Sequence, residues 1–229
     1  MNRAARLFLI ALLAMIATGL AWAVFSMPAQ EGGLGPLVAS RLDESGTRSE
    51  VTATLLNFRA YDTLLEIAVL LLAMMASWSL RVHQATPITL EPGPVLLALV
   101  RHLAPVMVLV AGYLAWVGSY EPGGAFQAGA VLGAAGVLVL LSGLPLAQRA
   151  RAGPFRIGVV LGLAVFATLG LWPMLFDAAF LEYPAQHAHL FILLIEIASA
   201  LSIGLILLAL FAGRPPTDAQ TMRSEQRLP

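Results

Sequence analysis

The sequence predicts an all-α protein that crosses a membrane several times. Of its 229 residues, 59% are hydrophobic and 11% are charged, whereas a soluble domain has about 45–50% apolar and about 25% charged residues. The chain therefore has too few charged side chains to cover a surface that faces water, and a soluble enzyme is excluded. Six mainly apolar stretches of about 20 residues predict about six transmembrane helices, in which each backbone polar group is paired within its own segment.

The six predicted spans cover residues 7–27, 62–80, 95–117, 125–144, 157–176 and 190–212. The first has an alternative interpretation, because Arg3 and Arg6 precede an apolar core and Ala21-Trp22-Ala23 resembles a signal-peptide cleavage site. The apolar run continues to Met27, which favours a retained helix. Removal of this span would leave the rest of the topology unchanged.

The positions of the 13 basic residues, all of them arginine, predict the orientation. Ten of them lie on the cytoplasmic side if both termini are cytoplasmic, and only Arg41, Arg48 and Arg59 lie outside, as the positive-inside rule requires. Residues 28–50 then form an outer loop, and the polar tail 213–229 is expected to be disordered. The net charge of zero gives no indication of a nucleic-acid partner.

Acidic residues within the spans are the first candidates for function. Glu66 follows Asp62 by one helical turn, and Arg59 precedes Asp62 by three residues, so the three form one stripe. Glu196 lies six residues, or about 9 Å, into the last apolar run, at a depth similar to that of Glu66. A carboxyl group in apolar surroundings can hold a proton near neutral pH and release it to an approaching cation. The alternative is that Arg59 and Asp62 pair at the headgroup level and that both glutamates only bind neighbouring helices.

An outer turn between the third and fourth spans is the second candidate. Pro122, Gly123 and Gly124 break the helix there, and Gln127 follows just inside the next span. Broken helices near an ion path occur in transporters, although an ordinary tight hairpin explains the same residues.

Two further patterns favour simpler interpretations. Rows of small residues, with Ala125, Gly129 and Gly133 in one and Gly158 and Gly162 in another, predict close helix packing. His187 and His189 near Glu182 are too few for a metal site, which needs three or four converging ligands. No metal site is therefore predicted.

The stretch VTATLLNFRAYDTLLEIAVL, residues 51–70, resembles the C-terminal part of the large A subunit of Mrp-type (multiple resistance and pH) sodium/proton antiporters and a small subunit of membrane-bound hydrogenases. The matching positions are Phe58, Arg59, Asp62, Thr63 and Glu66. The sequence departs from the family pattern where Asn57 replaces an aspartate and where Ala60 and Leu65 replace glycines.

Residues 99–140 resemble another component of the same antiporters, their MnhB-like membrane protein. The matching positions are Arg101, Pro105, Gly118, Pro122, Gly123, Gly124, Phe126, Gln127, Ala128 and Gly129. Ala125 replaces a glycine of that pattern. Ser202 stands where the last helix of the family often has a charged residue.

Together the two resemblances imply a fusion of neighbouring antiporter modules, with an A-like segment at 1–82 and an MnhB-like domain at 83–212. They imply an accessory subunit of a multi-subunit cation/proton antiporter in the inner (plasma) membrane, without a cofactor or enzymatic activity. Its expected partners are a large antiporter-like subunit, small membrane subunits and the lipid bilayer. The chain has no lysine, so the lysine-bearing pumping helices of the large subunits are absent. Two alternatives are a purely structural scaffold and a module of a related hydrogenase or other complex-I-like complex.

Overall fold

The structure is a computed structural model that describes residues 3–26, 33–80, 93–143, 152–184 and 187–213. Within these ranges every regular element is a helix, which confirms the predicted all-α membrane fold. Five helices are long and apolar enough to cross a membrane: α1 (Arg3–Ser26), α4 (Ala60–Leu80), α5 (Pro94–Val117), α8 (Ala152–Leu171, extended by the 3-10 helix η3, Trp172–Phe176) and α9 (Ala188–Ala212). Residues 214–229, which make up nearly all of the predicted tail, lie outside the described residues.

The fourth predicted span is a shorter helix, α6 (Ala125–Leu141), of 17 residues. At 1.5 Å per residue it is about 26 Å long, slightly less than the hydrocarbon core of a bilayer. Glycines at both ends explain its length. Gly124 precedes it with φ +107° and Gly143 follows it with φ +63°, a backbone region that other residues rarely adopt.

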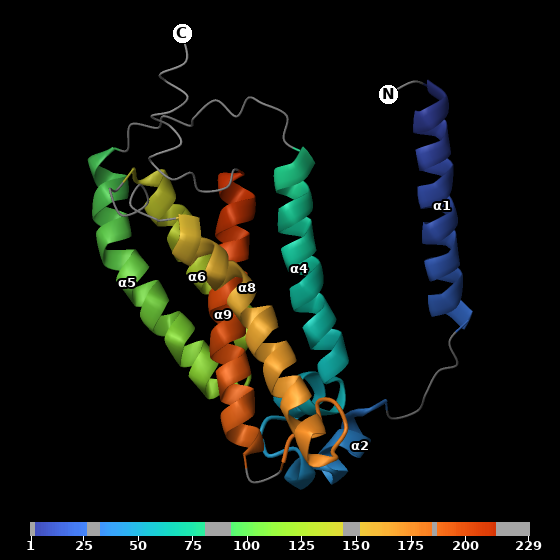
Figure 1. Ribbon diagram of the computed structural model, residues 1–229. Coiled ribbons are helices and arrows are strands. Elements are labelled where there is room, and N and C mark those ends of the chain that lie inside the picture. The colour runs from blue at the N-terminus through green and yellow to red at the C-terminus, as the bar shows by residue number, and fades with distance from the viewer. Residues whose placement is uncertain (1–2, 27–32, 81–92, 144–151, 185–186, 214–229) are drawn as a thin grey trace. The chain divides into compact units, whose positions relative to one another are not determined.

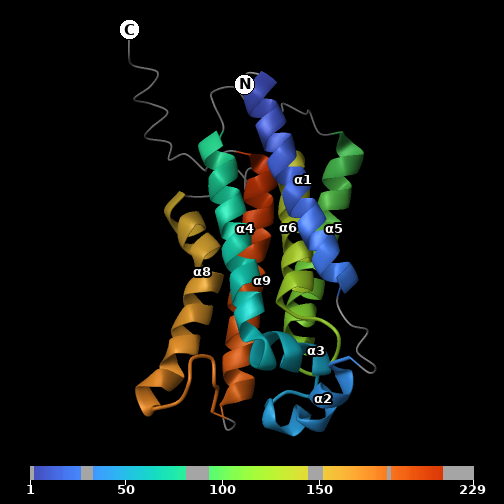
Figure 2. The same ribbon diagram turned by 90° about the vertical axis from the view of Figure 1, so that its right-hand side faces the viewer.

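The chain divides into two units, residues 1–36 and 37–229. Helix α1 forms the first unit, and none of its residues is buried. The second unit contains the remaining spans. In it α9 is the central helix, and it packs against α4, α5, α6 and α8 (Figures 1 and 2). Four isoleucines of α9 are at most 2% exposed: Ile192, Ile195, Ile203 and Ile206.

The rows of small residues bring α6 and α8 close to α9, as the sequence predicts. A Cβ atom on Gly129 would lie 3.0 Å from the Ala200 carbonyl oxygen, and one on Gly162 would lie 2.9 Å from the Cα of Ser199. Ser202 donates a hydrogen bond of 2.5 Å to the Val159 carbonyl oxygen and so links α9 to α8. Packing is therefore the role of these small residues within the described chain.

Several short elements gather at one end of the second unit, which we call the loop end (Figure 1). They are α2 (Gly35–Ser40), η1 (Leu42–Glu44), α3 (Glu50–Ala53), the π-helix η2 (Thr54–Phe58), the α5–α6 turn at 118–124 and the connecting residues 172–184. The turn is joined to the first of these segments by a hydrogen bond of 3.1 Å from the Arg48 amide to the Ser119 carbonyl oxygen. Both α4 and α9 begin at this end.

Candidate functional site

Glu196 is the one charged side chain that is buried among the described residues, with 2% exposure. It lies eight residues into α9, about 12 Å from the start of the helix. This depth exceeds the expected 9 Å because the helix begins at Ala188 rather than at Leu190. Its Oε2 atom is buried and has no hydrogen-bond partner among the residues that the structure describes. A buried polar atom without a partner is costly, so this oxygen is a candidate to bind a proton or a cation.

The α5–α6 turn forms a cradle of glycines around the Glu196 carboxyl group. A Cβ atom would lie 2.7 Å from Oε1 of Glu196 if it were added to Gly118, and 3.0 Å away if added to Gly124. The turn closes on the end of α5 because the Gly124 amide donates a hydrogen bond of 2.8 Å to the Leu114 carbonyl oxygen. Gly123 allows this closure, since its Cβ would lie 2.7 Å from the same Leu114 oxygen. The glycines therefore provide the space that the carboxyl occupies.

Gln127 connects this cradle to an open groove. Its Oε1 and the Oε1 of Glu196 lie 3.8 and 3.0 Å from the Cβ position of Gly124, so the two oxygens are at most about 7 Å apart. Gln127 is itself exposed and lines a groove of about 560 Å³ between α4, α6 and α9. Figure 2 shows α9 between α4 and α6. Water or an ion in the groove would therefore be one polar side chain away from the buried carboxyl.

Glu66 lines the opposite wall of the same groove, on α4. The side chain is exposed and lies six residues, about 9 Å, into its helix. Apart from Glu66 and Gln127, all of its lining residues are apolar, among them Leu70, Phe126 and Ile203. The structure thus brings Glu66 and Gln127 together at one groove, with Glu196 buried behind Gln127.

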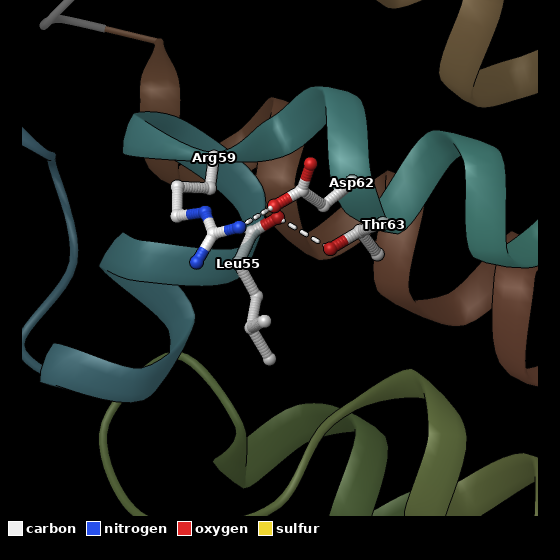
Figure 3. A network of polar contacts seen from close by, with 4 residues as sticks. All are labelled: Leu55, Arg59, Asp62 and Thr63. Carbon is white, nitrogen blue, oxygen red and sulfur yellow. Dashed lines mark hydrogen bonds and ion pairs between the residues drawn. The ribbon is translucent and has the colours of Figure 1, made fainter. Parts of the chain in front are cut away.

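Arg59 and Asp62 form an ion pair at the start of α4 (Figure 3). The distance between Nη2 and Oδ2 is 2.5 Å, and the two side chains are 57% and 46% exposed. The π-helix ends at this point, where the Arg59 amide donates a hydrogen bond to the Thr54 carbonyl oxygen. Thr63 then donates a hydrogen bond of 2.6 Å to the Leu55 carbonyl oxygen. The pair therefore lies on the surface next to a helix irregularity of a kind that is frequent at functional sites.

The two histidines of the loop end, His187 and His189, have separate surroundings. Among the described residues no three His, Cys, Asp or Glu side chains converge on a common position. His189 is hydrogen-bonded through Nε2 to the Tyr120 hydroxyl at 2.9 Å, whereas Glu182 accepts a hydrogen bond from the Ala179 amide. At the same end, burial raises the pKa of Tyr183 far above its usual value, because the phenolate would be desolvated.

Sequence reasoning missed the residues that hold the cradle from outside. Thr52 is buried, and its hydroxyl donates a hydrogen bond to the Gly118 carbonyl oxygen. Ser119 is fully buried, with a hydroxyl that has no partner. Both are short polar residues that lie outside the predicted spans. A contact between residues 66 positions apart leaves no local signal in a single sequence.

Comparisons with known proteins agree with this architecture. The chain is similar to part of a longer chain in the structure of the Mrp complex from Dietzia sp. DQ12-45-1b, with 22% identity and a TM-score of 0.64. The match covers 96% of the present chain and 27% of the Mrp chain. It is also similar to a chain in the structure of the membrane-bound sulfane sulfur reductase (MBS), an archaeal respiratory membrane complex, with 24% identity and a TM-score of 0.69. This match covers 91% of the present chain and 97% of the MBS chain. These two likenesses establish the fold.

The family is established by sequence. No curated protein gives a significant match. Residues 95–215, more than half of the chain, match the model of a domain related to the MnhB subunit of Na+/H+ antiporters. This region contains the cradle glycines, Gln127 and Glu196. The chain therefore belongs to the family of proteins with this MnhB-related domain.

Proposed function

We propose that this chain is an accessory membrane subunit of a multi-subunit monovalent cation (sodium)/proton antiporter, and that Glu196, Gln127 and Glu66 contribute to an ion path at a subunit interface. The observation that carries the proposal is the buried Glu196 carboxyl, which has an unpartnered oxygen and lies behind a glutamine that lines an open groove. Membership in the MnhB-related family supports the cation/proton chemistry.

The physical argument starts from the cost of these carboxyl groups. An acidic side chain within a membrane-spanning helix costs about 2.5–3.5 kcal/mol, and such residues commonly belong to ion or proton pathways. No basic side chain within bonding distance offsets the charge of Glu196 in the described part of the chain. A bound proton or a dehydrated cation would neutralise it. Each of these can be exchanged for the other, as antiport requires.

The groove also supports the need for partner subunits. It is an open groove, and one of its lining residues is Glu66, an exposed acidic side chain six residues into α4. A neighbouring subunit that covers the groove would enclose Glu66 and Gln127 within one path. The chain has no lysine to act as the cationic element of a pump. We therefore propose that it works with a large antiporter-like subunit and small membrane subunits rather than alone.

The remaining parts of the proposal concern organisation. We propose that residues 1–82 form the A-like segment and residues 83–212 the MnhB-like domain, in a multi-pass protein of the inner (plasma) membrane with both termini in the cytoplasm. The positions of the arginines support this orientation. Arg59 and Asp62 are then an outer ion pair, and Asp62 precedes Glu66 by one turn of α4.

Transport by the assembled complex in membrane vesicles tests the proposal. Glu66→Gln keeps the size of the side chain and removes its charge. We expect normal assembly and loss of most cation-dependent proton antiport. Glu44→Gln, at an exposed acid of the loop end, is the matched control and should transport normally. Reduced assembly of the Glu66→Gln variant with unchanged transport per complex would instead indicate a purely structural role.

A related energy-coupling complex is the second candidate. The chain spans nearly the whole length of the MBS chain that it matches, but about a quarter of the Mrp chain. Its function would then be that of a membrane module coupled to a hydrogenase or another redox enzyme. Purification of the native complex followed by mass spectrometry separates the two candidates. Large and small antiporter subunits support the first, and redox-enzyme subunits support the second.

A further inference from the structure

The loop-end segment 45–52 holds the outer face of the Glu196 cradle through two hydrogen bonds. The Thr52 hydroxyl donates to the Gly118 carbonyl oxygen, and the Arg48 amide donates to the Ser119 carbonyl oxygen at 3.1 Å. Both acceptors follow the last residue of α5, where carbonyl groups lack a partner within the helix. The segment therefore completes the hydrogen bonding of a turn that it does not belong to.

The same segment is fixed internally before it meets the turn. The Ser49 hydroxyl accepts a hydrogen bond of 3.3 Å from the Thr52 amide and so caps α3. The Asn57 side chain donates a hydrogen bond of 3.1 Å to the Ser45 carbonyl oxygen. Gly46 adopts φ +72° and lies against the start of α9, where an added Cβ would be 2.6 Å from that of Ala188. These contacts hold Thr52 in place next to Gly118.

The contact is made to Gly118, the residue that also adjoins the buried carboxyl. The Cβ position of Gly118 is 2.7 Å from Oε1 of Glu196, and Gly118 is also the residue whose carbonyl group Thr52 binds. Without the Thr52 hydroxyl, the Gly118 carbonyl group would need another donor, and water is the available one. That water would enter beside Glu196. The hydroxyl of Thr52 occupies the position at the Gly118 carbonyl oxygen that such a water would take.

We propose that residues 45–52 form a clamp in which Thr52 is a positioning residue, which holds the α5–α6 turn against Glu196 and closes the outer approach to it. Exchange with Glu196 then takes place from the groove, through Gln127. The clamp also joins the proposed A-like segment to the MnhB-like domain, next to Glu196. The expected effect of the clamp on transport rests on the proposed function. The closure of the turn can be measured whether or not that function is correct.

The absence of cysteine from the chain makes the closure directly measurable. Ser119→Cys introduces one nearly isosteric thiol at a fully buried position in the turn. The assembled complex is treated with methyl methanethiosulfonate, and labelling of this chain is followed by mass spectrometry. We expect Thr52→Val to increase the labelling rate about five- to tenfold, as the loss of one buried hydrogen bond implies. Thr52→Ser keeps the hydroxyl and should change the rate less than about twofold.

Hydrogen exchange provides a second measurement for the case that Ser119→Cys does not assemble. The amides of Tyr120 and Gly124 are hydrogen-bonded to the carbonyl oxygens of Val117 and Leu114. In Thr52→Val without the added cysteine, these amides should exchange about five- to tenfold faster than in the wild type, for the same reason. Equal exchange or labelling in the two proteins would overturn the clamp.

Transport separates this inference from the function that it rests on. If both hold, Glu196→Gln abolishes antiport, Thr52→Val changes its rate several-fold, and Thr52→Ser restores the wild-type rate. Loss of antiport in Glu196→Gln with an unchanged rate in Thr52→Val would overturn the positioning role alone. A wild-type rate in Glu196→Gln would instead overturn the part of Glu196 in the ion path, and labelling would still decide whether the clamp exists.

Discussion

Gly118→Ala tests whether the cradle depends on the absence of a side chain. Gly118 has φ −52° and ψ −31°, which alanine adopts without strain, so only space is altered. The new Cβ would lie 2.7 Å from both Oε1 of Glu196 and the Cα of Gly124. Ordinary contacts begin near 3.4 Å, so these atoms must move apart by about 0.7 Å. Overpacking of this kind costs about 1–3 kcal/mol.

The measurement is the thermal unfolding midpoint of the full chain in detergent micelles. For a protein of about 150–250 residues, 1 kcal/mol shifts Tm by about 2–4 °C, so Gly118→Ala should lower it by roughly 2–12 °C. Gly112→Ala is the matched control, because Gly112 lies within α5 and an added Cβ there meets nothing within 4 Å. Equal midpoints for the two variants would refute the argument that the turn closes tightly around the carboxyl.

Two further substitutions test neighbouring contacts. Ser202→Ala should destabilise the chain by about 0.5–1.5 kcal/mol, because it removes the hydroxyl donor that links α9 to α8 at the Val159 carbonyl oxygen. Chemical unfolding in mixed micelles measures this loss, and Ser79→Ala, at an exposed hydroxyl bonded within its own helix, is the control that should change little. Asp62→Asn should change stability by less than about 1 kcal/mol, because its ion pair with Arg59 is exposed to solvent. A larger loss that persists at high salt would show that the pair is enclosed.

The spans were predictable because each is an apolar run of about 20 residues, and composition alone decides such a property. The length of α6 was less predictable, since the apolar run continues to Leu144 but the helix ends at Leu141, before the glycine with positive φ. The segment before the second predicted span forms α3 and a π-helix that ends at Phe58, and α4 begins at Ala60.

The individual site residues were predictable by type, but their relations were not. An acid within a span is visible in the sequence, and so are Pro122, Gly123 and Gly124. That Glu66 and Gln127 share a groove while Glu196 is enclosed by glycines of the turn depends on how α4, α6 and α9 pack. Thr52 could not be found at all, since its partner is distant along the chain. The residue types at the site could therefore be predicted from the sequence, whereas the tertiary contacts between them could not.

The proposal that Glu196 takes part in an ion path is tested most directly by the antiport rate per assembled complex in vesicles that carry Glu196→Gln. Glu121→Gln, at an exposed acid of the adjoining turn, is the control. We predict that Glu196→Gln assembles normally and loses most of its antiport, while the control retains the wild-type rate. A normally assembled Glu196→Gln complex that transports at the wild-type rate would contradict the proposal.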